Sequence, residues 1–235
     1  MPDHDLSLLA WHFLRDDQRM QYLPFTPVKA GQTYTAEGPL MLCENGLHGS
    51  VQAIDALQHA PGSIICRVRL SEERINEGDK SCARSRTVLW LANAALVLHE
   101  FTCCLAELAV LRAVASGYTT DERSAAVIAA RRTLLQREHG IPALVAARGD
   151  ALDGVWEAVG QSPWGVPGRL AVTRIADWME TGDSAWAAGR VACRAARDII
   201  GMTAGYTARE TAWITMNVGL ERMLRTLAPH EGDER

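Results

Sequence analysis

The chain has 235 residues, of which 48% are apolar and 22% charged, which is typical of a globular protein with one large domain or two small ones. A formal net charge of -4 argues against a dedicated nucleic-acid-binding protein, because such proteins usually present a basic surface on a basic domain. No apolar run is long enough for a membrane-spanning helix, and the first residues are acidic where a secretory signal is basic, so we expect a cytoplasmic protein with reduced thiols that does not bind membranes.

The first 91 residues are expected to form a β-rich N-terminal domain. Its clearest strand is Ile64–Leu70, where alternate apolar residues predict one buried face and two arginines mark the other. The turn signal Pro61-Gly62 precedes this strand. Further strands are predicted at residues 8–14, 33–35, 39–42 and 84–91, and one short helix at residues 51–58.

Residues 92–228 are expected to form a helical C-terminal domain, followed by a flexible tail at residues 229–235. Apolar residues recur there at helical spacing, alanine is abundant, and most of the tryptophans lie after residue 150. Helices are predicted at residues 92–115, 120–139, 141–147, 150–159, 169–179, 183–203 and 207–227. Because strands and helices are segregated along the chain, we expect an α+β fold: a small mixed or antiparallel sheet with one short helix, followed by an Ala/Trp-rich helical bundle.

The most informative stretch is residues 42–50, with the sequence LCENGLHGS. A turn separates Cys43 from His48, and Ser50 is predicted to cap the short helix that follows. A thiol and an imidazole beside a helix N-terminus form a candidate binding site for an anion, so Cys43 and His48 are candidate binding residues. A structural interpretation explains the same residues: His48 bonds to a turn carbonyl and Cys43 lies in the core.

An ordered series of motifs runs through the first ninety residues. It comprises Trp11-His12-Phe13, Gly31-Gln32-Thr33-Tyr34, Cys43-x-x-Gly46-Leu47-His48-Gly49-Ser50, Ala56-Leu57 and Asp79-Lys80. In this series the chain resembles an uncharacterised domain family of bacteriophages and prophage-like bacterial regions, in which the central motif usually shows Cys, Gly, an apolar residue, His and a small residue. The Ala-rich second half resembles the extension that some members carry. The resemblance implies a phage-type origin, with the host cytoplasm as the location, but no reaction.

The order of residues in the N-terminal domain also loosely resembles the split sheet of ADP-ribosyltransferases. In those enzymes a His or Arg on the first strand, a later Ser or Tyr and a late Glu hold NAD. The matching positions are His12, then Tyr34 or Ser50, with Glu72 or Glu73 last. The candidate catalytic residues that this resemblance implies, with NAD as the cofactor, are His12, Tyr34, His48 and Ser50.

Two groups of basic residues are candidates for binding an acidic partner. Arg190, Arg194 and Arg197 are four and three residues apart, so they share one face of a predicted helix. This stripe fits an acidic protein or a nucleic acid, and equally a solvated helix face. The second group, Asp79-Lys80 with Arg84 and Arg86, fits either an anion site or an exposed salt-bridged loop.

No metal site is expected, because the chain has no Cys-x-x-Cys pair. His99 and Cys103 lie four residues apart, as two ligands on one helix face would. An amphipathic helix with an interfacial His and a buried thiol explains this pair without a metal.

Two functions stay open from the sequence, and they differ on whether the protein is an enzyme. The first is a phage-type accessory protein without a cofactor, which binds a host or defence-system protein as an anti-defence inhibitor. The missing catalytic signature, the near-neutral charge and the large helical surface favour it. The alternative is an ADP-ribosyltransferase-like enzyme that uses NAD in a pocket around His12 and His48. A homodimer also stays open, because a chain this rich in alanine offers a free helix face that a second copy could cover.

Overall fold

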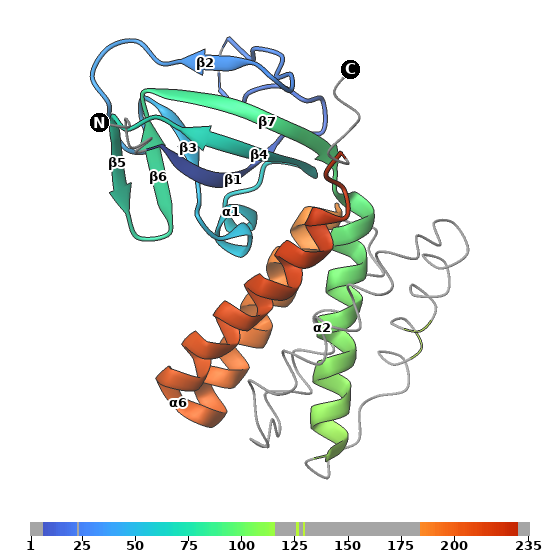
Figure 1. Ribbon diagram of the computed structural model, residues 1–235. Helices are drawn as coiled ribbons and strands as arrows, with labels where there is room; N and C mark the ends of the chain where they lie inside the picture. Colours follow the sequence, from blue (N-terminus) through green and yellow to red (C-terminus); the bar gives the residue numbers. More distant parts are fainter. Residues whose placement is uncertain (1–6, 23, 116–125, 127–128, 130–183, 230–235) are drawn as a thin grey trace, which may run out of the picture. The chain divides into compact units, whose positions relative to one another are not determined.

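The computed structural model describes residues 7–22, 24–115, 126, 129 and 184–229 (Figure 1). These residues form an antiparallel sheet region followed by helices, so the prediction of an α+β fold is confirmed. Contacts divide the chain into two compact units, Met1–Ala94 with Leu227–Arg235, and Ala95–Thr226, and each is described by itself. Apart from the helical residues Ala126 and Ala129, the helices predicted between residues 120 and 179 lie outside the described residues, as does the tail from residue 230.

The main sheet of the first unit has four antiparallel strands in the order β1-β4-β7-β2. The strands are β1 (Leu8–Leu14), β2 (Thr33–Thr35), β4 (Ile64–Leu70) and β7 (Ser85–Asn93). The first three coincide with predicted strands, and β7 overlaps the strand predicted at residues 84–91. Alternation located Ile64–Leu70, and apolar or β-prone composition located the other strands of this sheet.

The two faces of the main sheet carry different side chains. Residues opposite one another in the register point to the same face, so Val68 and Val88 pack together in the hydrophobic core of the unit. The other face carries an aromatic stack. Trp11 and Trp90 meet edge to face with ring centroids 5.8 Å apart, and Arg67, between them in the register, stacks on Trp11 at 4.5 Å.

A second sheet has three short antiparallel strands in the order β3-β6-β5. They are β3 (Leu47–Gly49), β5 (Arg74–Glu77) and β6 (Lys80–Ala83). The β5–β6 hairpin was not predicted, because its residues are mostly polar and show no clear alternation. Its turn is Gly78-Asp79, and Gly78 takes a φ of 56°, which glycine adopts without steric cost.

The strand predicted at residues 39–42 is wrong. Residues 42–44 form a turn, and Met41 makes only an isolated bridge with Asn45. The Met41 N–H donates to the Asn45 carbonyl at 2.9 Å, and the Asn45 N–H donates back at 2.8 Å. Because these bonds close the turn locally, the backbone of Met41 does not pair with a neighbouring strand.

Helix α1 (Ala53–Gln58) packs against β1 and begins at Ala53 rather than at residue 51. The predicted serine cap is wrong, because Gln52 holds the cap position and makes no side-chain capping bond. The backbone of Ser50 instead exchanges hydrogen bonds of 2.7 and 2.9 Å with Trp11. The chain thus stays extended for one residue beyond β3, and the helix starts later than the sequence suggests.

In the second unit, α2 (Ala95–Ala115) and α6 (Ala185–Arg225) pack against each other. The helix predicted at residues 92–115 begins later, because β7 continues to Asn93. Element α6 spans the two helices predicted at residues 183–203 and 207–227. None of the described helices combines the length and the apolar character that a membrane span requires.

The chain reverses direction within α6. Arg197 and Glu210 are 13 residues apart and form an ion pair of 2.9 Å. A straight helix would separate them by about 20 Å, because each residue adds about 1.5 Å along the axis. The orange first part and the red last part of α6 therefore lie side by side (Figure 1). Buried small residues on the first part, such as Ala188 and Ala192, allow this close approach.

Candidate functional site

Three side chains of the first unit meet at its surface, and we name them the Cys43 site: Cys43, His48 and Lys80. They come from the turn at residues 42–44, from β3 and from the start of β6. The Lys80 ammonium donates to the Cys43 Sγ at 2.9 Å, and the Cys43 backbone N–H donates to the His48 Nε2 at 3.2 Å. The fold thus gathers a thiol, an imidazole and an ammonium group from separate motifs of the sequence.

The Cys43 thiol is exposed, so the interpretation of Cys43 as a core residue is wrong. Its backbone has a φ of 67°, in the left-handed region, where a residue with a side chain loses about 1–2 kcal/mol. The backbone bonds between Met41 and Asn45 hold this conformation. The turn therefore holds the sulfur atom toward solvent at a cost in backbone energy.

The His48 ring is neutral in this arrangement. Its Nε2 accepts a hydrogen bond from a backbone N–H, so the ring proton sits on Nδ1. Burial lowers the pKa of His48, and the charges of Arg86 and Lys80 lower this pKa further. The hydrogen bond to the Cys43 thiol raises the pKa of Lys80, so that its ammonium group stays charged. The Cys43 site therefore places one ammonium group against one sulfur atom, with the charges of Asp79 and Glu77 acting on the same ammonium group.

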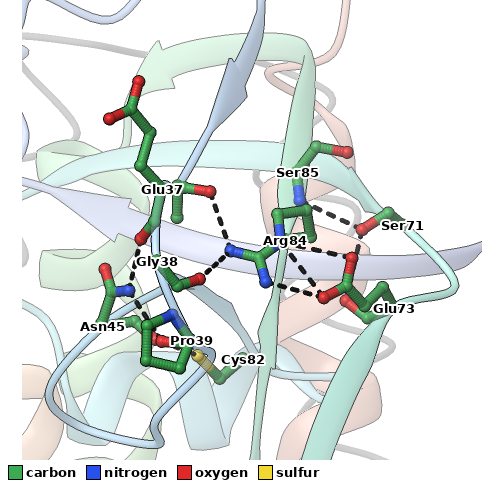
Figure 2. A network of polar contacts seen from close by, with 10 residues as sticks. Glu37, Gly38, Pro39, Asn45, Ser71, Glu73, Cys82, Arg84 and Ser85 are labelled. Carbon is green, nitrogen blue, oxygen red and sulfur yellow. Dashed lines mark hydrogen bonds and ion pairs between the residues drawn. The ribbon is translucent and has the colours of Figure 1, made fainter.

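Arg84 fastens the chain before the turn (Figure 2). One of its terminal nitrogens donates to the backbone carbonyls of Ala36, at 3.0 Å, and Gly38. The other nitrogens bind the Glu73 carboxylate, with a shortest distance of 2.7 Å. One side chain thus ties this loop to the start of the β5–β6 hairpin.

Asn45 and Cys82 fasten the turn itself (Figure 2). The Asn45 Nδ2 donates to the carbonyls of Glu37 and Pro39 at 2.6 and 2.8 Å. The Cys82 thiol on β6 donates to the carbonyl of Asn45 at 3.4 Å. The position of Cys43 is therefore set by bonds to main-chain atoms on both sides of it.

Both glycines of the central motif lie where a side chain would clash with a neighbouring residue. A Cβ at Gly46, whose φ is 137°, would overlap the Cys82 Sγ. A Cβ at Gly49 would lie 3.0 Å from the Cβ of Ala10. The strand β3 can approach the main sheet, and the turn can rest on Cys82, only because these two positions lack side chains.

A buried cation lies behind the Cys43 site. Arg86 on β7 is only 3% exposed and donates from Nη1 to the His48 carbonyl at 2.8 Å. Burial lowers the pKa of Arg86 to about 10, so the group keeps its charge at neutral pH. The other described groups that act on this charge are the Cys66 thiol and the Tyr34 phenol, neither of which is a carboxylate. Its Nε is buried and makes no hydrogen bond within the described residues.

His12 stands next to Arg86 on the same face of the main sheet. It lies opposite Cys66 in the register, and its ring is half-buried. Burial lowers the pKa of His12 well below its ordinary value of 6.5, and the charges of Arg86 and His48 act in the same direction. Burial also raises the pKa of the Cys66 thiol to about 12, so this thiol stays protonated. The charges of Arg86 and His48 both act on His12, and Arg86 bonds to the His48 carbonyl, so the two histidines share one electrostatic environment.

Tyr34 and Ser50 do not add functional groups to this cluster. The Tyr34 hydroxyl bonds within its own loop, to the Lys29 N–H at 2.9 Å and to the Gln32 side chain at 2.6 Å. Ser50 is buried, and its described bonds are the two backbone bonds to Trp11. Tyr34 lies opposite Arg86 in the strand register, and its phenol is one of the groups that act on the Arg86 charge.

Besides the hydrogen bond to Cys43, the charges of two nearby acidic residues, Asp79 and Glu77, raise the pKa of Lys80. Glu73 is held by Arg84, and its neighbour Glu72 is exposed. Asp79 pairs with His59 at 3.0 Å. The basic group of the sequence is also dispersed, because Lys80 binds Cys43, Arg84 binds Glu73 and Arg86 is buried. Within the described residues, no group of three or more His, Cys, Asp or Glu side chains has the arrangement of a metal site.

The arginine stripe of α6 is partly engaged within the second unit. Arg197 pairs with Glu210 and stacks on Trp213 at 4.6 Å. Arg190 stacks on Trp186 at 5.1 Å, and burial and the charge of Arg194 lower the pKa of Arg190. Arg194 is exposed. The three side chains thus have three different environments and do not form one uniform basic surface.

Sequence reasoning named Arg84 as part of a salt-bridged loop, which its pair with Glu73 fits, but missed its bonds to the main chain. It missed the roles of Asn45 and Cys82 altogether, because bonds to main-chain atoms leave no motif in a sequence. Arg86 was grouped with its charged neighbours, although alternation with Val88 on a closing strand was a signal that it faces the core.

Comparison with known proteins gives one match. Residues 8–100 match a family described as a domain of unknown function (DUF7666). This match agrees with the resemblance of the first ninety residues to an uncharacterised family. Searches of curated proteins and of solved structures found no match.

Proposed function

We propose that the protein acts by binding a host or defence-system protein, and that the Cys43 site lies at the contact. The observation that carries this proposal is an exposed thiol on a turn whose conformation is set by bonds to its main chain, in contact with the Lys80 ammonium group of β6. A surface that is already ordered loses little conformational entropy on binding. The Lys80 ammonium group favours an acidic group on the partner.

The arrangement of charges supports binding over catalysis. The His48 Nε2 is occupied by a backbone N–H, so it is not free to take a proton from the thiol. Two of the described carboxylates of this unit are already paired, Glu73 with Arg84 and Asp79 with His59. A phage-type origin, suggested by the resemblance of the motif series, fits an inhibitor of a bacterial defence system.

The test is capture of partners from a host lysate with the tagged full chain, with mass spectrometry of both bait and prey. Cys43→Ser and Lys80→Gln should each reduce the amount of a stoichiometric prey. Lys29→Gln is the matched control, because Lys29 is the only other lysine and is exposed in the same unit. Equal capture by all three variants would rule out the Cys43 site as the contact.

The arginine stripe is a second contact surface to test in the same assay. Arg197 has to be kept, because its charge is used inside the second unit by Glu210. The variant is therefore Arg190→Glu with Arg194→Glu. Loss of prey with an unchanged melting temperature would assign the contact to α6 rather than to the Cys43 site.

The alternative is an ADP-ribosyltransferase-like enzyme, and one observation favours it. His12 and His48 flank Arg86, a buried cation whose charge a phosphate group of NAD would neutralise. This function predicts that millimolar NAD raises the melting temperature and that His12→Ala abolishes the shift. A prey that carries an added ADP-ribose mass would support the enzyme, and the absence of any thermal shift would exclude it.

A further inference from the structure

The geometry points to an oxidative cross-link between the Sγ of Cys43 and the Nζ of Lys80, formed with a peroxide as the oxidant. The two atoms are 2.9 Å apart and belong to exposed or partly exposed residues. They come from the turn at residues 42–44 and from β6, so the bond would join two separate segments. The inference rests on this geometry alone and is independent of the partner.

Cys43 is set apart from the other thiols of the chain. The remaining five cysteines are all buried: Cys66, Cys82, Cys103, Cys104 and Cys193. Burial raises the pKa of Cys66, Cys82 and Cys193, and a protonated thiol reacts poorly with peroxides. Cys43 alone joins solvent access to contact with an ammonium group, the surroundings typical of reactive cysteines.

Lys80 is equally set apart from the other amine side chain. The chain has two lysines, and Lys29 belongs to the segment before β2. The turn that carries Cys43 is fixed by Arg84, Asn45 and the hydrogen bond to His48. The thiol therefore stays beside Lys80, which raises the effective concentration of the amine at the oxidised sulfur.

The chemistry balances in two steps. The Cys43 thiolate attacks a peroxide oxygen, the O–O bond breaks, and a sulfenic acid and a hydroxide ion form. The hydroxide takes a proton from the Lys80 ammonium, and the Nζ lone pair attacks the sulfur. The S–O bond then breaks and water leaves. In sum, one thiolate, one ammonium group and one hydrogen peroxide give one S–N bond and two waters.

The product is reversible and would switch the Cys43 site. Two equivalents of a small thiol reduce the S–N bond, restore the thiol and the amine, and leave as a disulfide. The cross-link consumes two of the three groups that form the site, the thiol and the amine, and removes the positive charge of Lys80. Oxidation would therefore remove the surface that the proposed function uses.

The test treats the reduced full chain with hydrogen peroxide and maps its peptides by mass spectrometry. We expect a cross-linked peptide that contains Cys43 and Lys80, lacks two hydrogens and disappears after treatment with a dithiol. The Lys80→Gln variant should instead accumulate a Cys43 sulfenic acid that a cyclic 1,3-diketone traps. Lys29→Gln should form the cross-link like the wild type.

Cys82 provides the decisive control, because its thiol bonds to Asn45 on the same turn and a disulfide also lacks two hydrogens. Cys82→Ser should leave the cross-link unchanged. A product that is lost in Cys82→Ser and kept in Lys80→Gln would be a Cys43–Cys82 disulfide and would overturn the inference. Recovery of Cys43 as a free thiol or a sulfonic acid in the wild type would overturn it as well.

Discussion

The steric role of Gly46 can be tested by adding one methyl group. Gly46 has a φ of 137°, and a Cβ there would come well inside 3.0 Å of the Cys82 Sγ. Backbone strain in such a region costs about 1–3 kcal/mol, and forcing an extra methyl into a packed site costs about 1–3 kcal/mol. Gly46→Ala should therefore lower the free energy of unfolding of the first unit by about 2–6 kcal/mol.

Two further variants separate these contributions. Gly78→Ala is the matched control, because Gly78 also has a positive φ, of 56°, but no atom within 4 Å of the added Cβ. Gly78→Ala should lower the free energy of unfolding only by the cost of a positive φ, about 1–2 kcal/mol. Cys82→Ala removes the clashing sulfur atom, and the next neighbour of the new Cβ is then the Leu40 Cδ2 at 3.1 Å. The double variant Gly46→Ala/Cys82→Ala should therefore cost about 1–3 kcal/mol less than the sum of the two single variants.

The assay is urea unfolding monitored by the hydrogen exchange of backbone amides in β3 and β6, because these amides report on the first unit. Equal losses for Gly46→Ala and Gly78→Ala would refute the steric argument. Additive effects of Gly46→Ala and Cys82→Ala would refute the assignment of the clash to the Cys82 sulfur. Either outcome would leave the motif glycine without a structural explanation.

Three further predictions concern charged groups. Arg84 lowers the pKa of Glu73, so the pair stabilises the fold above the ordinary pKa of 4.5 and this contribution is lost as the pH falls; Glu73→Gln should flatten that acid-side loss in pH-dependent melting. In the folded chain the pKa of His12 lies below its unfolded value of 6.5, so the unfolded chain binds the proton more tightly. The free energy of unfolding should therefore fall as the pH drops below 6.5. His12→Asn should make the free energy of unfolding less dependent on pH in this range. Arg197→Met removes the ion pair with Glu210 and the stack on Trp213, and should cost about 1–2 kcal/mol in urea unfolding.

The central strands of the main sheet were predictable because they are apolar. Ile64–Leu70 was located by its alternation, and Leu8–Leu14 by its nearly continuous run of apolar and aromatic residues. The hairpin of Arg74–Glu77 and Lys80–Ala83 was not predictable, because its outer strand is largely exposed and polar. Its stability comes from pairing with β3 and from contacts such as that of Arg84 with Glu73, and neither is visible in a local window.

The site was predictable in its members but not in its geometry. The motif placed Cys43 and His48 near each other, since a turn of a few residues cannot separate them far. Lys80 comes from another strand, and only the register of β3 with β6, in which His48 faces Cys82, brings it to the thiol. A register is set by the pairing of whole strands, so spacing along the chain could not reveal this contact.

The backbone of Cys43 connects the two roles that this residue has. Its backbone N–H donates to the His48 ring and so stabilises the turn. Its sulfur atom contacts Lys80 at the protein surface. A cysteine in a base-activated catalytic pair would instead need the imidazole nitrogen within reach of the thiol. In this site that nitrogen is used to hold a strained turn, and the group next to the sulfur is an ammonium, which stabilises a negative charge but does not accept a proton. The site therefore presents an exposed thiol beside an ammonium group in one fixed position, which suits recognition and reversible modification better than turnover.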